Sequence, residues 1–255
     1  MAVDIGNSNV HCGVFDGPRL RRRWTVPTQT VRDTGELDLP PESARALGTV
    51  VVCSVAPSAS ATLREWLSRN ADAPALWVES VGQTGLTTRY SSPESVGIDR
   101  LVACRAALEA YRGRAVVVDV GTATTVDLVT SDGVHLGGAI GPGVDVAANA
   151  LSREAELLRP VRLDVAPCAI GTNTEECVRI GFVRGFAGLV DRLIEDAVAE
   201  AGWSLPDVPC VATGGRADLV ARLSRRVREV RPALVLEGLR AIWQEARPPR
   251  PPHGD

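Results

Sequence analysis

The sequence predicts an α/β protein of two similar domains, because one pattern occurs twice and strand patterns alternate with helix patterns. Residues 2–17 read AVDIGNSNVHCGVFDG, and residues 115–133 read AVVVDVGTATTVDLVTSDG. Each stretch is an apolar strand, an Asp-x-Gly turn with small polar residues, a second apolar strand and a closing Asp-Gly, which favours a hairpin turn. We interpret this repeat as an ancient duplication that divides the chain into domains at 1–113 and 114–246.

Apolar runs between turn residues predict the elements of the first domain. The run TVVVCS at 49–54 is short and β-branched, which is typical of a buried strand. In a helix over 60–70, Leu63 and Trp66 would share one face. Residues 27–48 carry several Pro, Gly and Thr and predict a loop with one turn of helix. After the first hairpin, the strands of this domain are predicted at 21–26, 49–54 and 75–78, and its helices at 60–70 and 98–112.

The second domain is predicted to open with a three-stranded meander and to continue with helices around one more strand. The strands are predicted at 115–118, 125–129, 135–140 and 209–212, and the helices at 144–158, 174–201, 217–223 and 234–245. We interpret Arg21–Arg23 as a solvated strand edge and Arg225–Arg231 as a solvent-facing helix end. The Pro-rich tail at 247–255 is predicted to be disordered.

The charged residues limit the kinds of reaction and partner that this protein could have. The 255 residues carry a formal net charge of −3, which gives no field for nucleic acid or an anionic membrane. Every cation is an arginine, and the absence of lysine excludes a P-loop lysine, a protein-kinase strand lysine and Schiff-base chemistry. The histidines are His11, His135 and His253, and neither His11 nor His135 lies in a nucleophile motif. Proton transfer is therefore expected from carboxylates.

The cysteines and the apolar runs indicate the compartment. The six cysteines form no C-x-x-C pair, so zinc and iron–sulfur sites are not expected. We expect these cysteines to be buried thiols of a protein in a reducing compartment. The N-terminus shows no signal peptide, and no apolar run reaches the roughly 18 residues that a membrane helix needs. We expect a cytoplasmic protein without membrane or nucleic-acid partners.

The repeated Asp-x-Gly turn is suited to binding phosphate. A tight turn between strands points successive backbone N–H groups at one place, and glycine allows a close approach. Gly6, Asn7 and Ser8 would hold phosphate, and Asp4 at the strand end would hold Mg²⁺, directly or through water. A single such turn is also compatible with an ordinary hairpin. The matching turn at Asp119 favours the phosphate interpretation.

Two facing phosphate loops resemble the superfamily of actin-like ATPases and sugar kinases. In that superfamily two ribonuclease-H-like domains hold the nucleotide in a cleft between them, and a glycine pair after a late strand lies near the adenosine. Gly214 and Gly215 occupy that place in the order of the chain. The resemblance implies the same fold here, with Asp4 and Asp119 facing each other across the cleft.

Further motifs resemble the type III pantothenate kinase family. A segment with Tyr90 upstream of Gly-x-Asp-Arg at 97–100 is similar to the substrate segment of that family. The other matching stretches, in family order, are Gly121–Asp127, Gly137–Gly143, Ile170–Thr174 and Glu237–Arg240. The resemblance implies ATP-dependent phosphorylation of pantothenate to 4′-phosphopantothenate, the first step of coenzyme A biosynthesis, by a homodimer.

The resemblance also implies roles for individual residues. Asp99 would accept the proton of the substrate hydroxyl, Arg100 would bind the pantothenate carboxylate, and Thr174 would contact substrate across the dimer interface. Asp119 would bind a monovalent cation, K⁺ or NH₄⁺. The implied ATP-binding residues are Asp4, Ile5, Gly6, Asn7, Ser8, Asn9, Val10, His11, Thr122, Gly214 and Gly215, and the implied substrate-binding residues are Tyr90, Gly97, Ile98, Asp99, Arg100 and Thr174.

The sequence leaves alternative interpretations open for several of these residues and for the function. Asp99 could be a carboxylate favoured by a helix dipole, and Tyr90 could be a packed strand aromatic. Ala155 stands where family members usually carry Thr, and 27–48 is short for the helix that normally packs there, so substrate affinity could differ. The alternatives to a pantothenate kinase are a non-catalytic or regulatory homologue and a kinase of another small hydroxyl substrate on the same fold.

Overall fold

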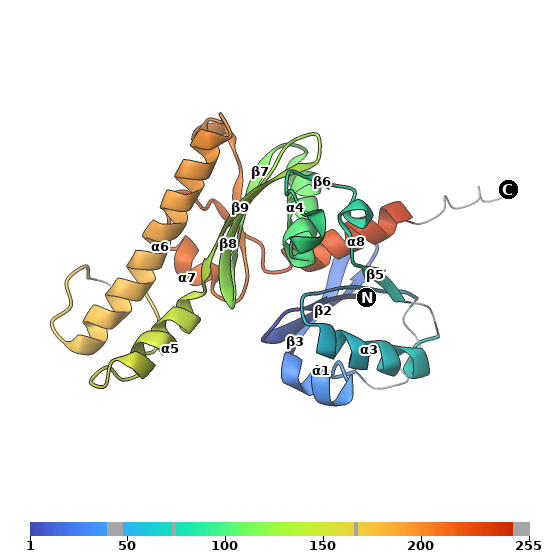
Figure 1. The fold of residues 1–255 in the computed structure, drawn as a ribbon, viewed down its shortest axis with the longest axis horizontal. Coiled ribbons are helices and arrows are strands. Elements are labelled where there is room, and N and C mark those ends of the chain that lie inside the picture. Colours follow the sequence, from blue (N-terminus) through green and yellow to red (C-terminus); the bar gives the residue numbers. More distant parts are fainter. Residues whose placement is uncertain (40–47, 73–74, 166–167, 247–255) are drawn as a thin grey trace. The chain divides into compact units, whose positions relative to one another are not determined.

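The computed structural model describes residues 1–39, 48–72, 75–165 and 168–246, and its elements are drawn in Figure 1. The chain divides into two compact units. Unit 1 comprises Met1–Thr87, Ser92–Glu109 and the chain from Val235 onward, and unit 2 comprises Thr88–Ser91 and Ala110–Leu234. The predicted tail at 247–255 lies outside the described residues.

Unit 1 is a five-stranded mixed sheet with helices. Its sheet has the order β3-β2-β1-β4-β5, antiparallel from β3 to β1 and parallel from β1 to β5. The edge position of β3 leaves Arg21–Arg23 exposed, which confirms the predicted solvated edge. The strands are β1 (Ala2–Ile5), β2 (Asn9–Asp16), β3 (Arg19–Pro27), β4 (Val50–Ser54) and β5 (Ala75–Val78), and the helices are α1 (Thr28–Thr34), α3 (Pro57–Asn70), the short 3₁₀ helices η1 (Val81–Thr84) and η2 (Pro93–Ser95), α4 (Ile98–Tyr111) and α8 (Leu234–Ala246).

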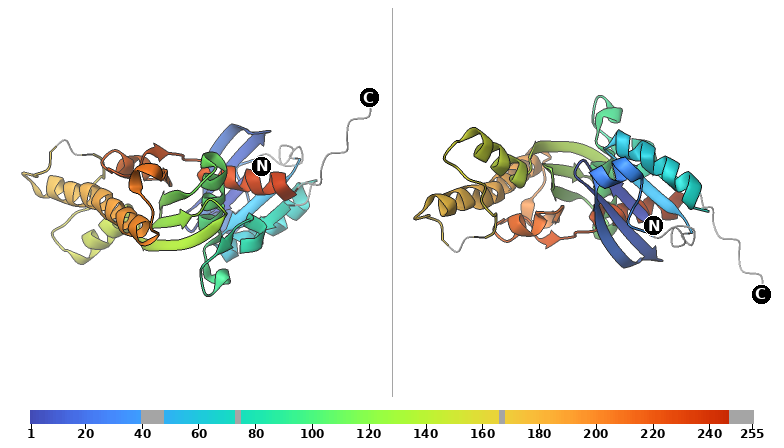
Figure 2. Two further views of the ribbon diagram at one scale, coloured as in Figure 1. Left: turned by 90° about the horizontal axis from the view of Figure 1, so that it is seen from above. Right: turned by 90° about the horizontal axis from the view of Figure 1, so that it is seen from below.

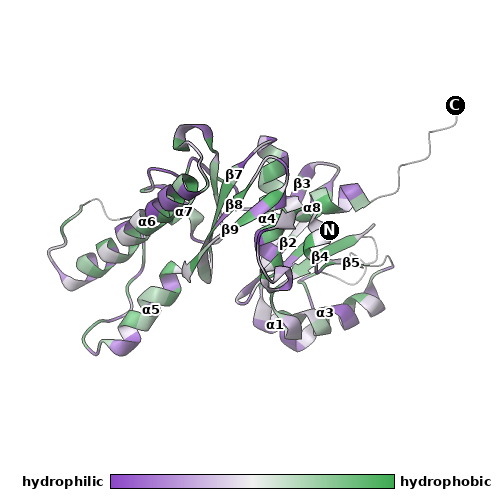
Figure 3. Ribbon diagram, turned by 45° about the horizontal axis from the view of Figure 1, so that its top comes forward, coloured by the Kyte–Doolittle hydropathy of each residue, from purple (hydrophilic) through white to green (hydrophobic). Residues whose placement is uncertain are grey.

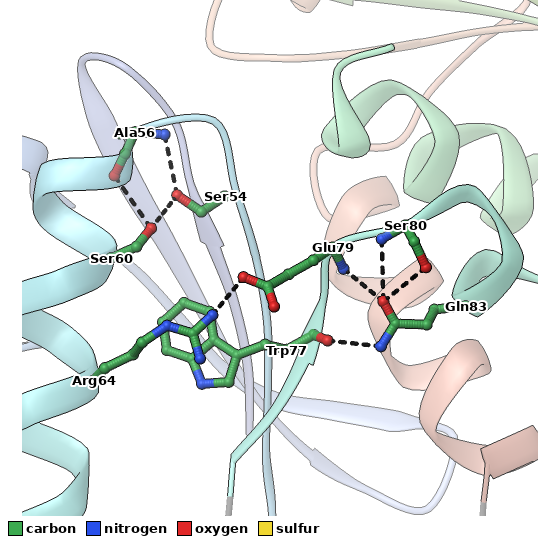
Figure 4. Close-up of polar contacts among 8 residues, drawn as sticks. All are labelled: Ser54, Ala56, Ser60, Arg64, Trp77, Glu79, Ser80 and Gln83. Carbon is green, nitrogen blue, oxygen red and sulfur yellow. Dashed lines mark hydrogen bonds and ion pairs between the residues drawn. The ribbon is translucent and has the colours of Figure 1, made fainter. Parts of the chain in front are cut away.

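Helix α3 is fixed on the sheet by both apolar and polar contacts. Leu63 and Leu67 are buried in one core cluster with residues of β1 and β4. Arg64 stacks 3.7 Å from the Trp77 ring of β5 and pairs with Glu79, while Gln83 of η1 donates to the Trp77 carbonyl (Figure 4). These contacts join α3, β5 and η1 on one side of the unit.

Unit 2 is built around a six-stranded mixed sheet of order β11-β10-β7-β8-β9-β6. The central strands β7 and β8 are largely hydrophobic (Figure 3), and the long α6 packs beside α5 (Figures 1 and 2). The strands are β6 (Thr87–Thr88), β7 (Ala115–Val120), β8 (Ala123–Val129), β9 (Val134–Pro142), β10 (Cys210–Thr213) and β11 (Glu229–Val230), and the helices are α5 (Val144–Glu154), α6 (Thr174–Glu200), the 3₁₀ helix η3 (Leu205–Asp207) and α7 (Ala217–Ala221).

The two sheets repeat one topology, which confirms the predicted α/β class and the internal repeat. The order β3-β2-β1-β4-β5 of unit 1 corresponds strand for strand to β9-β8-β7-β10-β11 of unit 2. In each unit the first three strands of the chain are antiparallel and the later two run parallel to the first. The repeated sequence pattern therefore marks equivalent strands.

Three sequence predictions differ from the structure. Helix α8 belongs with unit 1 and not with the second domain, because its contacts are to α4 and β2. Residues Arg225–Arg231 are not a helix end: Asp191 accepts from the N–H groups of Arg225 and Arg226, and the chain then enters β11, which was not predicted. Helix α5 ends at Glu154 and not at 158.

Helices α4 and α8 pack at backbone distance. A Cβ on Gly238 of α8 would lie 2.1 Å from the carbonyl oxygen of Val102 in α4, so only glycine fits there. Arg240 donates to Glu109 over 2.8 Å, and Arg105 pairs with Glu245. These contacts fix α4, the helix whose first turn carries Asp99.

We expect Gly238→Ala to lower the free energy of unfolding by about 1–3 kcal/mol, because the added methyl group overpacks the α4–α8 contact. The melting temperature of purified protein should fall accordingly. Gly82→Ala is the control, since its Cβ would meet nothing within 4 Å. An unchanged melting temperature for Gly238→Ala would contradict the packing described.

Candidate functional site

The phosphate-loop residues of unit 1 form a tight turn between β1 and β2. The Gly6 N–H donates to the Asn9 carbonyl over 3.0 Å, and a Cβ on Gly6 would lie 3.0 Å from the same oxygen. Thr28, which is buried, donates through its hydroxyl to the Gly6 carbonyl and through its N–H to the Ser8 carbonyl. Thr28 is a support of the turn that no sequence motif indicated.

The other predicted residues of this segment have different surroundings. Ile5 and Val10 are fully buried in the core, so their side chains cannot contact a ligand. Asn7, Ser8 and Asn9 are exposed at the turn. His11 Nδ1 lies 3.0 Å from the Thr25 hydroxyl, and burial, then the charge of Arg23, lowers the pKa of His11.

The Asp4 carboxylate lies against a buried thiol. Register places Asp4 of β1 opposite Cys53 of β4, and the Cys53 thiol donates to Asp4 Oδ1 over 3.5 Å. Burial raises the pKa of Cys53 well above its usual range, and the negative charges of Asp4 and Asp99 raise it further. The thiol therefore stays protonated and remains a donor to Asp4.

Asp99 is held in the first turn of α4 by backbone groups. Its Oδ1 accepts from the Arg100 N–H over 2.8 Å. A Cβ on Gly97 would lie 2.7 Å from that oxygen, so the glycine makes room for the carboxylate. Ile98 and Arg100 are buried. The first turn of α4 thus presents a carboxylate and fixes an arginine beside it.

The turn after β7 in unit 2 is packed even more closely. A Cβ on Gly143 would lie 2.1 Å from the Gly121 carbonyl oxygen, and the Gly143 N–H donates to the Thr122 carbonyl over 2.9 Å. Gly214 has φ +94°, and its Cβ would lie 2.3 Å from Asp119 Oδ1. These contacts bring Asp119, Thr122 and Gly214 together at the turn after β7.

An ion pair joins two of these loops. Arg216 follows the glycine pair and donates to both carboxylate oxygens of Asp145, at 2.6 and 2.7 Å. Asp145 lies in the first turn of α5, just after Gly143, and the hydrogen bond to Asp145 raises the pKa of Arg216. This pair ties the loop after β10 to the loop after β9, and the sequence motifs did not indicate it.

The surroundings of Asp119 fit a hard cation. Thr125 is directly across from Asp119 in the β7–β8 pair, so both side chains point to one face. The buried hydroxyl oxygen of Thr125 has no hydrogen-bond partner among the described residues; that of Thr124 has none either, but it lies on the opposite face of the sheet, with Val120. Carboxylate, hydroxyl and carbonyl oxygens are ligands of hard cations. No group of three or more His, Cys, Asp or Glu side chains in the described ranges could alone hold a metal.

The remaining residues that were predicted to bind substrate are divided between the units. Tyr90 lies in unit 2, where its ring contacts that of His135, while Gly97–Arg100 belong to unit 1. Thr174 is the first residue of α6 and is exposed, next to Asn173, whose side chain caps that helix. Ala155 lies at the C-terminal end of α5. No helix of the described chain is long and apolar enough to cross a membrane.

Comparison with known proteins gives close relatives along nearly the whole chain. Residues 1–196 match a family model described as type III pantothenate kinase. The type III pantothenate kinase of Thermomicrobium roseum is 40% identical over 252 residues, 96% of each chain. That of Anaeromyxobacter sp. (strain K) is 39% identical over 256 residues, 97% of this chain and 99% of the relative.

Solved structures share the fold at lower identity. A conserved putative Baf family transcriptional activator from Campylobacter jejuni has a TM-score of 0.61 at 22% identity, over 96% of this chain and 98% of that one. A putative 2-dehydro-3-deoxygalactonokinase from Sinorhizobium meliloti also has a TM-score of 0.61, at 16% identity, over 97% and 99%.

The thiols give a test of the site as described. Cys12, Cys53, Cys104 and Cys210 are buried as predicted, whereas Cys168 and Cys177 are exposed. Burial raises the pKa of Cys12 to about 12 and that of Cys210 to about 11, so few of these thiols ionise at pH 8. We expect a thiol reagent at pH 8 to spare the four buried thiols in native protein and to modify all six cysteines only after denaturation. Rapid labelling of Cys53 in native protein, read by peptide mass spectrometry, would contradict its burial.

Proposed function

We propose, from the premise that the chain belongs to the type III pantothenate kinase family, that it transfers the γ-phosphoryl group of ATP to the primary hydroxyl of pantothenate. The observation that carries this proposal is the Asp99 carboxylate, which accepts from the Arg100 N–H in the first turn of α4, in the same unit as the turn at Gly6–Ser8. A carboxylate suited to general-base work and a turn suited to phosphate in one unit support the transfer. The product would be 4′-phosphopantothenate, which leads toward coenzyme A.

Asp99 is the proposed proton acceptor. The hydroxyl oxygen of the substrate attacks the γ-phosphorus, the bond to the β–γ bridging oxygen breaks to release ADP, and the hydroxyl proton passes to Asp99. Arg100 is the proposed partner of the substrate carboxylate, because a guanidinium can bind a carboxylate through two parallel hydrogen bonds. Its burial beside Asp99 supports a fixed geometry.

Backbone groups and cations would neutralise the phosphates in a chain without lysine. We propose that the turn at Gly6–Ser8, Thr122 and the pair Gly214–Gly215 hold ATP, with Mg²⁺ at Asp4. A monovalent cation, K⁺ or NH₄⁺, is proposed at Asp119, supported by the unpartnered buried hydroxyl of Thr125 on the same face of the sheet. The cations supply charge neutralisation, and the protein residues position the nucleotide.

A coupled assay that follows ADP formation tests the function. We expect pantothenate-dependent ADP release that K⁺ stimulates, and we expect Asp99→Asn to lower kcat by about 10²–10⁴-fold, as loss of a general base does. The KM for ATP should change little, because the proposed ATP contacts lie on other loops.

Glu65→Gln is the control, since Glu65 pairs with Arg69 on the solvent-exposed face of α3. Wild-type protein that binds ATP and releases no ADP with pantothenate would contradict the function. Turnover of Asp99→Asn within about threefold of wild type would show that Asp99 is not the base.

We also propose a homodimer formed through unit 2. Its surface exposes large apolar side chains on β9, α5, α6 and the chain between these helices, where a second copy would remove them from water. Ile140 is 64% exposed, Leu157 91% and Ile170 82%. Thr174, a proposed contact for substrate bound to the partner subunit, begins α6 close to Ile170 in the chain.

The dimer can be tested by analytical ultracentrifugation. We expect wild-type protein to sediment at about twice the 27.0 kDa chain mass, and Ile140→Asp combined with Leu157→Asp to sediment as a monomer with reduced turnover. Ser131→Asp, in an exposed turn of the same unit, is the control and should stay dimeric. A fully active wild-type monomer at assay concentration would rule out the dimer.

A further inference from the structure

A buried carboxylate–imidazole pair lies under the segment Thr88–Ser91 and takes no part in the phosphate loops. His135 Nε2 is 2.8 Å from Asp127 Oδ1, and the two side chains are 0% and 2% exposed. His135 Nδ1 is 3.0 Å from the Thr88 hydroxyl oxygen. That oxygen also accepts from the backbone N–H of Tyr90 over 3.2 Å. Four groups are thus joined in one chain of hydrogen bonds.

The chemistry of the groups fixes the direction of this chain. A carboxylate only accepts, so His135 carries its proton on Nε2 and donates it to Asp127. In this tautomer Nδ1 accepts, and the Thr88 hydroxyl donates to it. The hydroxyl oxygen keeps a lone pair for the Tyr90 N–H. One tautomer therefore satisfies every donor and acceptor from Tyr90 to Asp127.

The ring of Tyr90 rests on the same strand. Its centroid lies 5.6 Å from that of His135, and its Cε1 lies 3.4 Å from where a Cβ on Gly137 would be. Gly137 has φ +111°, a conformation that suits glycine. The Arg89 N–H donates to the His135 carbonyl over 2.9 Å. Strand β9 thus holds both the backbone and the ring of this segment.

We propose that Thr88, His135 and Asp127 are positioning residues that hold Tyr90 for the acceptor substrate, so that they set the affinity for pantothenate and not for ATP. The proposal rests on the function above, in which Tyr90 contacts pantothenate. The backbone of the segment pairs with β9 through the two-residue β6 and the Arg89 N–H, and side-chain hydrogen bonds add to this short ladder. Burial of a carboxylate and an imidazole costs stability unless both are paired, and here the paired groups order a surface segment.

Thr88→Val tests this, because it removes the hydroxyl and keeps the shape of the side chain. We expect the KM for pantothenate to rise about 5–100-fold, the effect of losing the two hydrogen bonds of this hydroxyl, with the KM for ATP within about twofold of wild type. Thr88→Ser, which retains the hydroxyl, should restore the wild-type value. In a Tyr90→Ala background, Thr88→Val should add no further change. An equal rise in both KM values, or the same rise without Tyr90, would overturn the proposal.

A readout without catalysis separates this inference from the proposed function. Amide hydrogen exchange of the peptide covering residues 88–91 should be faster in Thr88→Val than in wild type and unchanged in Thr88→Ser. Unchanged exchange in Thr88→Val would refute the positioning role. If wild-type protein does not phosphorylate pantothenate, the proposed function is wrong. A faster exchange in Thr88→Val would even then show that the hydrogen-bond chain holds Tyr90 in place.

Discussion

Close backbone packing at glycines is the constraint on which the loops of each unit depend. In unit 2 the Gly143 Cα lies so near the Gly121 carbonyl that a methyl group would overlap it, and Gly214, with φ +94°, approaches Asp119 in a conformation that L side chains rarely adopt. In unit 1 Gly97 leaves room for the Asp99 carboxylate, which an added Cβ would displace. Glycine therefore fixes the surroundings of both acidic side chains. Preorganised groups of this kind need not rearrange when charge develops during phosphoryl transfer.

Because the chain contains no lysine, its structural ion pairs are formed by arginine. Its planar guanidinium can bind a carboxylate through two hydrogen bonds, which fixes direction as well as distance. Arg216 uses both bonds on Asp145 and so joins the loops after β9 and β10, while Arg240 joins α8 to α4 through Glu109. Neither carboxylate belongs to the proposed phosphate contacts. The arginines thus stabilise the loops and helices that carry the site.

Local patterns predicted the strands and the repeat, but not the partners of every element. Alternating apolar residues and Asp-Gly turns define β1–β3 and β7–β9 because those signals lie within a few residues of each other. The return of α8 to unit 1 depends on the fit of Gly238 against Val102, a contact between distant segments. The pair of His135 and Asp127 was not predicted for the same reason: Asp127 ends the motif stretch Gly121–Asp127, but its partner lies on the next strand, outside the motifs. Tertiary contact, not local pattern, decides these positions.

The two equivalent aspartates have diverged in their neighbours, and this divergence favours different roles for them. On the parallel partner strand, Asp4 is paired with Cys53, whereas Asp119 is paired with Thr213. On the antiparallel partner, Asp4 faces His11 and Asp119 faces Thr125. Hydroxyl oxygens around Asp119 are suited to direct contact with a weakly hydrated cation, while a thiol and an imidazole are poor ligands for Mg²⁺. A magnesium ion at Asp4 would therefore keep most of its water, and phosphate oxygens would supply its other ligands.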